Sequence, residues 1–411
     1  MGITSSRKSE KGFLPKRIIY FIERPFTEYF QRLYGVTTLL ENGFDVTVWD
    51  FTALVAPTLV GIKVPDPSRF EQVVIMSDRK GALRQVRALT SADFVIMKLH
   101  FGPGTLDFFR ALSESGAGYL MTNSDAVAIG RGSADLRVSI KDLARRLTGI
   151  LTSSAKWRAA IFHRLPPSIW RIKPAALIVA GGGEAAGHIK HLPTGPRTEL
   201  LWSHASDYDR LMGLRSKQRA VEHIVFLDEY LPFHYDNEVL GLGTPSDPQV
   251  YYAELRRFFA LIEARFHCRV VVAAHPKSDY GSHPDYFGGR RVERDQTPEL
   301  LLRAKFVILH ASTSVNLANI LDLPAVFVTN EQIKRTYLEG WITNIAKWYG
   351  KSPINLSDGK ALDSINWDRE LAVNKEAYAA FRRQFIKRPG TPEVPTWQMV
   401  SERLKQLLEC H

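Results

Sequence analysis

The chain has 411 residues, more than one hydrophobic core usually organises, so two domains of roughly 150–200 residues each are expected. Hydrophobic residues make up 45% of the sequence and charged residues 24%, a balance that excludes disorder as the main state. The formal net charge of +11 favours an anionic partner, whether nucleic acid, an acidic membrane surface or a phosphorylated substrate.

Cysteine content and hydropathy indicate the compartment. Cys268 and Cys410 are too few for a disulfide framework, and we interpret Cys268, beside the apolar run 270–274, as a small buried hydrophobe. No run of about 18 apolar residues could span a bilayer, and the basic segment 1–16 lacks the apolar core of a signal peptide. We therefore expect a cytoplasmic protein, with peripheral contact at the inner membrane left open.

Strand and helix patterns alternate through the first half of the chain. Apolar runs bounded by turn residues predict strands at 17–22, 45–50, 73–76, 92–99, 118–121 and 175–180. Helical periodicity predicts helices at 25–41, 79–89, 105–113 and 138–165. This β-α-β alternation predicts a parallel sheet.

The same alternation resumes after a less regular transition at 199–209 and a polar linker at 215–222. Strands are predicted at 223–227, 269–274, 306–309 and 325–329, with helices at 248–266, 298–304, 314–321 and 397–408. The fold class is therefore α/β, with two tandem Rossmann-like domains and a C-terminal crossing helix. The predicted divisions are a disordered lead-in at 1–15, an N-terminal Rossmann-like domain at 16–214, a C-terminal Rossmann-like domain at 215–390 and the crossing helix at 391–411.

Polar side chains follow the strands of the second domain, where ligands bind in open α/β sheets. Strand 269–274 ends in His275-Pro276-Lys277. Imidazole and ammonium together can neutralise a phosphate, and the histidine can donate a proton to a leaving oxygen. Pro276 fixes the backbone as the chain leaves the sheet. The alternative is a surface loop that happens to contain these residues.

A second polar segment, His310-Ala311-Ser312-Thr313-Ser314, follows strand 306–309 and precedes a helix. Backbone N–H groups at a helix N-terminus favour anions and hydroxyls add donors, although Ser and Thr are also ordinary N-caps. Two such segments at adjacent strand ends favour one shared phosphate site over two unrelated loops.

An acidic pair, Asp228-Glu229, follows strand 223–227. Two carboxylates beside a phosphate site would repel a phosphate-bearing ligand unless they serve another purpose. One of them could be a general base that takes a proton from an acceptor hydroxyl. The other interpretation is an acidic hinge held by Lys or Arg.

Three weaker patterns stay open. The glycines at 181–183 permit close backbone approach to a ligand or form a tight turn, without the full dinucleotide-binding spacing. His188 and His191 have metal-ligand spacing, although solvent exposure is the favoured interpretation. Asp207-Tyr208-Asp209 would coordinate a metal, orient an acceptor or form a structural turn, and a turn is slightly favoured.

A mixed basic and aromatic stretch spans 156–173. Its members are Lys156, Trp157, Arg158, His163, Arg164, Trp170, Arg171 and Lys173. This composition suits a membrane interface, a lipid-phosphate acceptor, nucleic acid or a solvated helix face. No groove-reading or base-stacking motif accompanies it, so no nucleic-acid partner is expected.

The segment 270–329 resembles GT-B glycosyltransferases that build bacterial capsule and lipopolysaccharide. In order, it contains His275-Pro276, Pro298-Glu299-Leu300-Leu301, Ser312-Thr313 and Leu323-Pro324. It is also similar to bacterial sialyltransferases and polysialyltransferases, which carry an acidic pair followed by glycine, a His-Pro motif and a Ser-Ser/Thr motif. Asp228-Glu229, His275-Pro276 and Ser312-Thr313 match these motifs, with Tyr230 where glycine would stand.

The resemblance implies a hexosyl-, sialyl- or Kdo-type glycosyltransferase that uses no cofactor and no metal. Its donor would be a nucleotide-sugar, with a CMP-linked sugar among the candidates, bound by the C-terminal nucleotide-sugar domain at 215–390. Its acceptor would be a glycan or a lipid-linked glycan, bound by the N-terminal acceptor domain at 16–214. The phosphate-binding residues would be His275, Lys277, Ser312, Thr313 and Ser314, with Glu299 on the sugar or ribose. Asp228 or Glu229 would be the base, and His275 would complete the catalytic group. A nucleotide-sugar epimerase, a polyol-phosphate transferase and a non-catalytic assembly partner remain alternatives.

Overall fold

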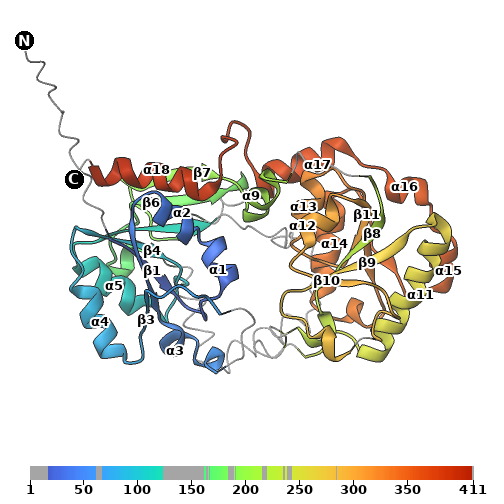
Figure 1. The fold of residues 1–411 in the computed structure, drawn as a ribbon, viewed down its shortest axis with the longest axis horizontal. Helices are drawn as coiled ribbons and strands as arrows, with labels where there is room; N and C mark the ends of the chain where they lie inside the picture. Colours follow the sequence, from blue (N-terminus) through green and yellow to red (C-terminus); the bar gives the residue numbers. More distant parts are fainter. Residues whose placement is uncertain are drawn as a thin grey trace, which may run out of the picture.

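The computed structural model describes residues 17–61, 67–123, 162, 165, 167–183, 189, 191–214, 220–234, 237, 243–283 and 285–409. The predicted lead-in at 1–15 lies outside these residues, as does nearly all of the predicted helix at 138–165. The described residues form two α/β domains that lie side by side (Figure 1).

The N-terminal domain is built on a parallel sheet of seven described strands in the order β3-β2-β1-β4-β5-β6-β7. The strands are β1 (Arg17–Ile22), β2 (Asp45–Asp50), β3 (Val73–Ile75), β4 (Asp93–Met97), β5 (Gly118–Asn123), β6 (Leu177–Gly181) and β7 (Glu199–Ser203). The first six confirm the predicted strands to within a few residues. Strand β7 was not predicted, because its sequence was interpreted as an irregular transition.

Short helices cover this sheet. They are α1 (Glu28–Leu33), α2 (Val36–Glu41), α3 (Thr52–Val55), α4 (Arg79–Arg87) and α5 (Leu106–Glu114), with 3-10 turns η1 (Pro57–Leu59) and η2 (Pro167–Trp170). The prediction of one helix over 25–41 is wrong, because Gly35 adopts the left-handed conformation, with φ of 62°, and separates α1 from α2. Trp397 occupies the space beside Gly35, so the break is built into the packing.

The C-terminal domain has a parallel sheet of six described strands in the order β10-β9-β8-β11-β12-β13. They are β8 (His223–Leu227), β9 (Arg269–Ala274), β10 (Val292–Arg294), β11 (Ala304–Leu309), β12 (Ala325–Thr329) and β13 (Ile354–Asn355). The four central strands confirm the predictions, whereas the short edge strands β10 and β13 were not predicted. Cys268 is half-buried at the start of β9, so it is less enclosed than expected.

Helices surround the second sheet on both faces. They are α9 (Ser206–Met212), α11 (Pro248–Phe266), α12 (Thr297–Leu301), α13 (Val315–Ile320), α14 (Leu338–Trp348), α15 (Gly359–Asp363), α16 (Trp367–Leu371) and α17 (Lys375–Phe381). The domain also contains the short 3-10 helices η4 (Leu231–Phe233), η5 (Tyr280–Ser282) and η6 (Ile333–Arg335) and the π-helix η7 (Arg382–Ile386). Helix α11 begins at Pro248 because Asp247 accepts hydrogen bonds from the N–H groups of Gln249 and Val250.

The chain crosses between the domains at two adjacent places. After β7, the Ala205 N–H donates to the Ile386 carbonyl at 2.8 Å, and His204 pairs with Lys387 in an antiparallel bridge. Helix α18 (Thr396–Glu409) then returns along the N-terminal domain (Figure 1), as the predicted crossing helix requires. Its buried residues Trp397, Val400 and Leu404 share one core with β1 and β2.

The glycine segment after β6 contacts the chain's own backbone at this crossing. Gly182 has a φ of 76°, and a Cβ there would lie 2.6 Å from the Gln384 carbonyl oxygen. The close approach that these glycines permit is therefore to the chain's own backbone in η7, and not to a ligand as one of the two interpretations had it.

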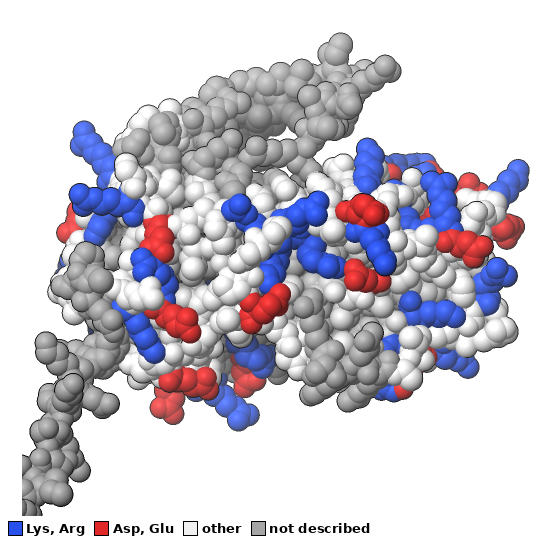
Figure 2. Space-filling model, turned by 90° about the horizontal axis from the view of Figure 1, so that it is seen from above, with Lys and Arg blue, Asp and Glu red and all other residues white. Residues whose placement is uncertain are grey.

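On the face shown in Figure 2, Lys and Arg side chains are interspersed with Asp and Glu. None of the described helices has the length and apolar character needed to cross a bilayer. Within the basic aromatic stretch, Trp170 stacks on Phe162 at a centroid distance of 4.6 Å, and Lys173 donates to the Ala117 carbonyl. Residues 156–158 and 163–164 lie outside the described residues.

Candidate functional site

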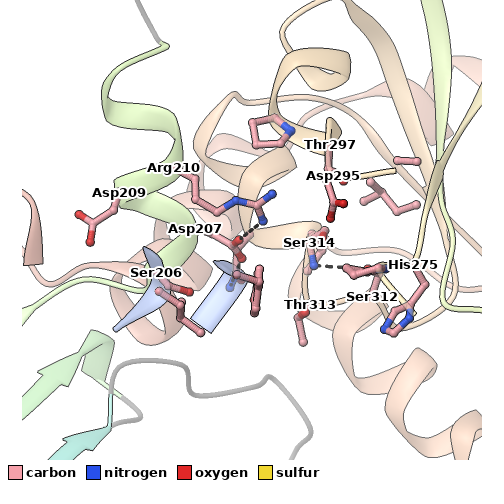
Figure 3. Close-up of a pocket in the computed structure, with 18 of the residues that line it drawn as sticks. Ser206, Asp207, Asp209, Arg210, His275, Asp295, Thr297, Ser312, Thr313 and Ser314 are labelled. Carbon is pink, nitrogen blue, oxygen red and sulfur yellow. Dashed lines mark hydrogen bonds and ion pairs between the residues drawn. The ribbon is translucent and has the colours of Figure 1, made fainter. Parts of the chain in front are cut away.

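A cavity of about 810 Å³ lies between the two domains, at the carboxyl ends of the C-terminal strands (Figure 3). Its wall on the C-terminal side comes from β8, β9, the β10–α12 turn, the β11–α13 loop and α9. The N-terminal domain contributes Tyr29, Arg32 and Leu33 of α1, and α18 contributes Trp397. Strand β8 lies between β9 and β11, so the cavity opens where the strand order reverses, the usual ligand position in open α/β sheets.

His275 lines the cavity directly after β9. The Lys277 N–H donates to the His275 Nδ1 at 3.2 Å, so the neutral ring carries its proton on Nε2. Pro276 also lines the cavity, whereas the Lys277 side chain is exposed and does not. Of the two predicted phosphate-binding side chains in this segment, the His275 imidazole therefore lies at the cavity. The Lys277 ammonium group does not.

Ser312, Thr313 and Ser314 line the cavity beside His275 (Figure 3). The Ser314 N–H donates to the Ser312 Oγ at 3.3 Å, and the Val315 N–H donates to the Ser312 carbonyl at 3.1 Å. These bonds fold the segment into a compact turn before α13. The two predicted strand-end segments therefore face one space, as their positions in the sheet require.

His310, which opens the same loop, is buried beneath it. Its Nδ1 lies 2.8 Å from the Val328 carbonyl and its Nε2 3.1 Å from the Tyr251 hydroxyl. Burial lowers the pKa of His310 to about 4, so the ring is neutral near neutral pH. His310 fixes the loop and does not reach the cavity lining.

Asp228 lies at the floor of the cavity and is 4% exposed. Its Oδ1 accepts from the Tyr230 N–H at 3.0 Å, and its Oδ2 accepts from the His275 N–H at 3.2 Å and the Tyr280 hydroxyl at 2.9 Å. Burial raises the pKa of Asp228 to about 6 even though these bonds favour the ionised form. The carboxyl group therefore ties the His275 segment to the end of β8.

Glu229 turns toward the other loop. Its Oε1 accepts from the Ala311 N–H at 2.7 Å and the His310 N–H at 3.2 Å, and the residue does not line the cavity. Burial of its carboxyl group, followed by the nearby Asp228 charge, raises the pKa of Glu229 to about 8. Among the described residues, amide and hydroxyl groups bind both acids, so the hinge held by Lys or Arg is not what the structure shows.

Tyr230, the residue at the glycine position of the compared motif, has a φ of 53°. This is the left-handed region that glycine favours and that costs other residues about 1–2 kcal/mol. The ring packs on Phe233 and Tyr280 at centroid distances of 5.4 and 5.2 Å. The departure from glycine therefore concerns the side chain, while the backbone keeps the conformation that glycine would supply.

The remaining wall carries further polar groups. Glu299, in the first turn of α12, lines the cavity. Asp295 and Thr297 also line it. Asp207 also lines it and accepts from Asn316 Nδ2 at 3.4 Å. Asp209 lines the cavity too and accepts from the Thr396 N–H of the crossing segment at 3.1 Å, while the Tyr208 hydroxyl donates to Glu393.

Sequence reasoning missed Arg32, Arg210 and Trp397 in the cavity lining. Arg210 lies seven residues after β7, so recognising 199–203 as a strand would have drawn attention to it. Among the described residues, no group of three or more His, Cys, Asp or Glu side chains is arranged to hold a metal ion. His191 is exposed, and His188 lies outside the described residues.

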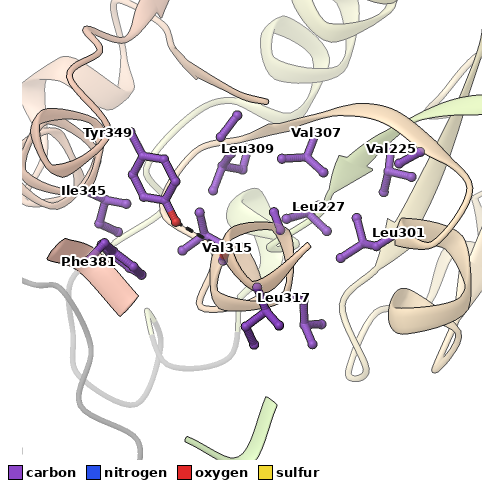
Figure 4. Close-up of a cluster of buried hydrophobic side chains, with 14 of the residues drawn as sticks. Val225, Leu227, Leu301, Val307, Leu309, Val315, Leu317, Ile345, Tyr349 and Phe381 are labelled. Carbon is purple, nitrogen blue, oxygen red and sulfur yellow. Dashed lines mark hydrogen bonds between the residues drawn. The ribbon is translucent and has the colours of Figure 1, made fainter. Parts of the chain in front are cut away.

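The floor of the cavity rests on an apolar core (Figure 4). Leu227, which precedes Asp228, and Val315, which follows Ser314, are both buried in the same cluster. Tyr349 donates its hydroxyl to the Val315 carbonyl at 3.3 Å within this cluster. The site therefore stands on packed side chains that hold the strand ends and α13 in fixed positions.

Comparison with solved structures identifies the architecture. The chain is similar to the wall teichoic acid polymerase TagF, with a TM-score of 0.51 and 10% identity over 96% of this chain and 90% of that chain. A histidine-to-asparagine variant of TagF soaked with CDPG gives a TM-score of 0.51 at 12% identity, covering 96% and 89% of the two chains. The UDP complex of MnaA from S. aureus gives 0.47 at 12% identity, covering 96% and 97%.

No protein-family model matches this sequence, and no curated protein matches it. The similarity to TagF therefore concerns the fold. It confirms the predicted α/β class with two parallel-sheet domains in the GT-B arrangement.

Proposed function

We propose that this protein is a GT-B glycosyltransferase that moves a sugar from a nucleotide-sugar donor to a glycan or lipid-linked acceptor. The observation that carries this proposal is the convergence of His275, Ser312–Ser314 and Asp228 on one cavity between two Rossmann-like domains. An imidazole, three hydroxyls and a carboxylate in one cleft supply the groups that such a transfer needs.

The donor phosphate would lie against His275 and the Ser312–Ser314 hydroxyls. The imidazole Nε2–H and the hydroxyls can donate hydrogen bonds to phosphate oxygens as negative charge develops on the leaving group. In this proposal these donors stabilise the leaving phosphate without a metal. Lys277 belongs to the donor site through its backbone, because its N–H orients the His275 ring.

Asp228 is the proposed base, because it is the member of the acidic pair that lines the cavity. With its pKa raised to about 6, it is ionised near neutral pH and binds a proton more readily than an ordinary carboxylate. Glu229 is proposed to position the Ser312 loop. Glu299, exposed at the start of α12, would accept hydrogen bonds from the sugar or ribose hydroxyls.

The finer parts of the proposal concern the substrates and the setting. We propose a role in bacterial surface-polysaccharide synthesis, with a CMP-linked sugar among the donors to test first. A polyol-phosphate transferase is the second candidate, because two of the structures compared above are of TagF, a wall teichoic acid polymerase, one of them soaked with CDPG. Both candidates place a nucleotide phosphate against His275 and differ in the group that is transferred.

Nucleotide binding and donor hydrolysis test this function. Thermal-shift measurements with CMP, CDP, UMP, UDP and GDP should show a raised unfolding midpoint for at least one nucleotide, by mass action. CMP-, UDP- and GDP-sugars and CDP-glycerol then reveal which group is transferred. His275→Ala and Ser312→Ala should lower turnover by about 100-fold or more, the scale of a lost acid or oxyanion donor.

The exposed His191 provides the matched control, because it lies outside the cavity lining. His191→Ala should bind nucleotide and turn over donor as the wild type does. Absence of a response to every nucleotide would refute the transferase proposal. Epimerised free sugar, formed without any acceptor, would replace it with epimerase activity.

A further inference from the structure

A guanidinium group faces the His275 and Ser312–Ser314 loops from the opposite wall of the cavity. Arg210 of α9 lines the cavity with Ser314, and its side chain points toward the Ser312–Ser314 segment (Figure 3). It pairs with Asp207 on its own helix, Nη1 to Oδ1, at 3.3 Å, and 38% of the side chain remains exposed. A guanidinium has five N–H donors, so this single pair leaves donors for a ligand.

Helix α9 is fixed to the domain that carries these loops, although it precedes β8 in the chain. Its Tyr208 and Leu211 are buried in one cluster with Leu227 and Val315. Asp207 also accepts from Asn316 Nδ2 of α13 at 3.4 Å, two residues after Ser314. Arg210 and the Ser312–Ser314 segment therefore belong to one rigid body, and their separation does not depend on how the domains are oriented.

Both acidic and basic side chains line the cavity. The acidic side chains that line it are Asp207, Asp209, Asp228, Asp295 and Glu299, and their negative charge would repel an anionic ligand unless a cation lies beside it. Lys277 does not line it, and among the described lining residues the permanently cationic side chains are Arg32 and Arg210. Arg32 stands on α1 of the other domain and is paired with Glu28 on its own helix at 3.8 Å.

We infer that Arg210 binds a phosphate group of the nucleotide ligand, opposite His275 and the Ser312–Ser314 hydroxyls. The inference rests on the proposed function and adds to it the residue that supplies the positive charge. The planar fork of a guanidinium matches two phosphate oxygens, and the pairing with Asp207 holds it in place before the ligand arrives. This residue binds the substrate and is not proposed to transfer a proton.

Calorimetric titration tests the inference with CMP, CDP, UMP, UDP and GDP, and with inorganic pyrophosphate, as probes. Arg210→Ala should weaken binding of the phosphate-bearing probes by at least about tenfold, the loss expected for a charged hydrogen bond. Arg210→Lys should recover part of that loss, because an ammonium keeps the charge without the fork. The wild-type affinity should fall more steeply with added salt than that of Arg210→Ala.

Arg84 on α4 is the matched control, because it is exposed and lies outside the cavity lining. Arg84→Ala should bind every probe as the wild type does, and all variants should keep the wild-type unfolding midpoint without ligand, since an exposed ion pair contributes little. Wild-type affinity in Arg210→Ala would overturn the inference and leave the transferase proposal standing. If the wild type binds neither the nucleotides nor pyrophosphate, both proposals fail.

Discussion

Asp228 and Glu229 are adjacent in the chain but hold different loops. Asp228 accepts from the His275 N–H, and Glu229 accepts from the N–H groups of His310 and Ala311. Because successive side chains at a strand end point to opposite sides, one acidic pair can tie together the two segments that flank β8. The two loops that flank β8 are therefore held in place by the carboxyl groups of Asp228 and Glu229.

We predict that Glu229 makes stability depend on pH. A carboxyl group whose folded pKa is raised from 4.5 to about 8 holds a proton that the unfolded chain releases. Its contribution to the free energy of unfolding is thus complete below about pH 4.5 and is lost as the pH rises toward 8. Relative to Glu229→Gln, the wild type should lose up to about 1.4 kcal/mol per pH unit in this window.

Urea unfolding of both proteins at several pH values measures this difference. Asp228 titrates in both, so its own raised pKa cancels in the comparison to first order. Parallel curves for the wild type and Glu229→Gln would show that Glu229 is ionised in the folded protein.

A second residue-scale prediction concerns the left-handed Tyr230. Tyr230→Ala and Tyr230→Gly both lose the ring contacts with Phe233 and Tyr280, but only glycine relieves the backbone. The glycine variant should therefore be more stable than the alanine variant by about 1 kcal/mol. Chemical denaturation compares the two directly, and an alanine variant equal to or above the glycine variant would contradict the prediction.

At the scale of elements, the α1–α2 turn and α18 are packed against one another through Gly35. A Cβ at Gly35 would lie 2.0 Å from Trp397 Cγ, whereas nothing lies within 4 Å of a Cβ at Gly43, which also has a positive φ. Gly43→Ala should cost about 1 kcal/mol of unfolding free energy from backbone strain alone. Gly35→Ala should cost more than about 2 kcal/mol, because it adds a clash with a side chain that cannot move aside cheaply.

A double-mutant cycle separates the two causes. Trp397→Ala removes the clashing ring, so Gly35→Ala should be less costly in that background than in the wild type. Equal costs in both backgrounds would mean that Trp397 does not set the requirement for glycine.

Most strands that could be predicted from sequence are strongly buried, although the exposed edge strand β3 was predicted as well. β1, β8 and β9 are almost wholly buried, mainly apolar runs, and their predicted bounds match the structure. The edge strands β7, β10 and β13 have mixed exposure, so their short sequences carry little hydrophobic pattern. Their existence depends on pairing with a neighbouring strand, which the local sequence does not encode.

The residues of the candidate site that could be predicted are those that follow predicted strands. His275 and Ser312–Ser314 follow strands that the pattern identifies, and the strand-end rule brings them to one cavity. Arg210 follows β7, which was not predicted, and Arg32 and Trp397 reach the cavity from elements far away in the sequence. Glu229 binds the loop after β11 through contacts between residues far apart in the sequence, so no spacing in the sequence could predict them.

At the scale of the whole molecule, α18 completes the core of the N-terminal domain. Leu404 is fully buried there, so Leu404→Ala should cost about 2–5 kcal/mol. Scanning calorimetry should show a lowered transition for the N-terminal domain and an unchanged one for the C-terminal domain. Glu402→Ala on the exposed face of α18 should change stability by less than about 0.5 kcal/mol. Equal shifts of both transitions in Leu404→Ala would show that the domains unfold as one unit.

The position of α18 also affects the order in which the cores of the two domains can be completed during synthesis. The first domain to leave the ribosome lacks Trp397, Val400, Leu404 and Leu408 until the whole second domain has been synthesised. The core of the second domain, from Ala205 to Ile386, contains none of these late residues and can assemble earlier. We therefore expect the core of the N-terminal domain to be completed last, with part of its apolar surface exposed until α18 has been synthesised.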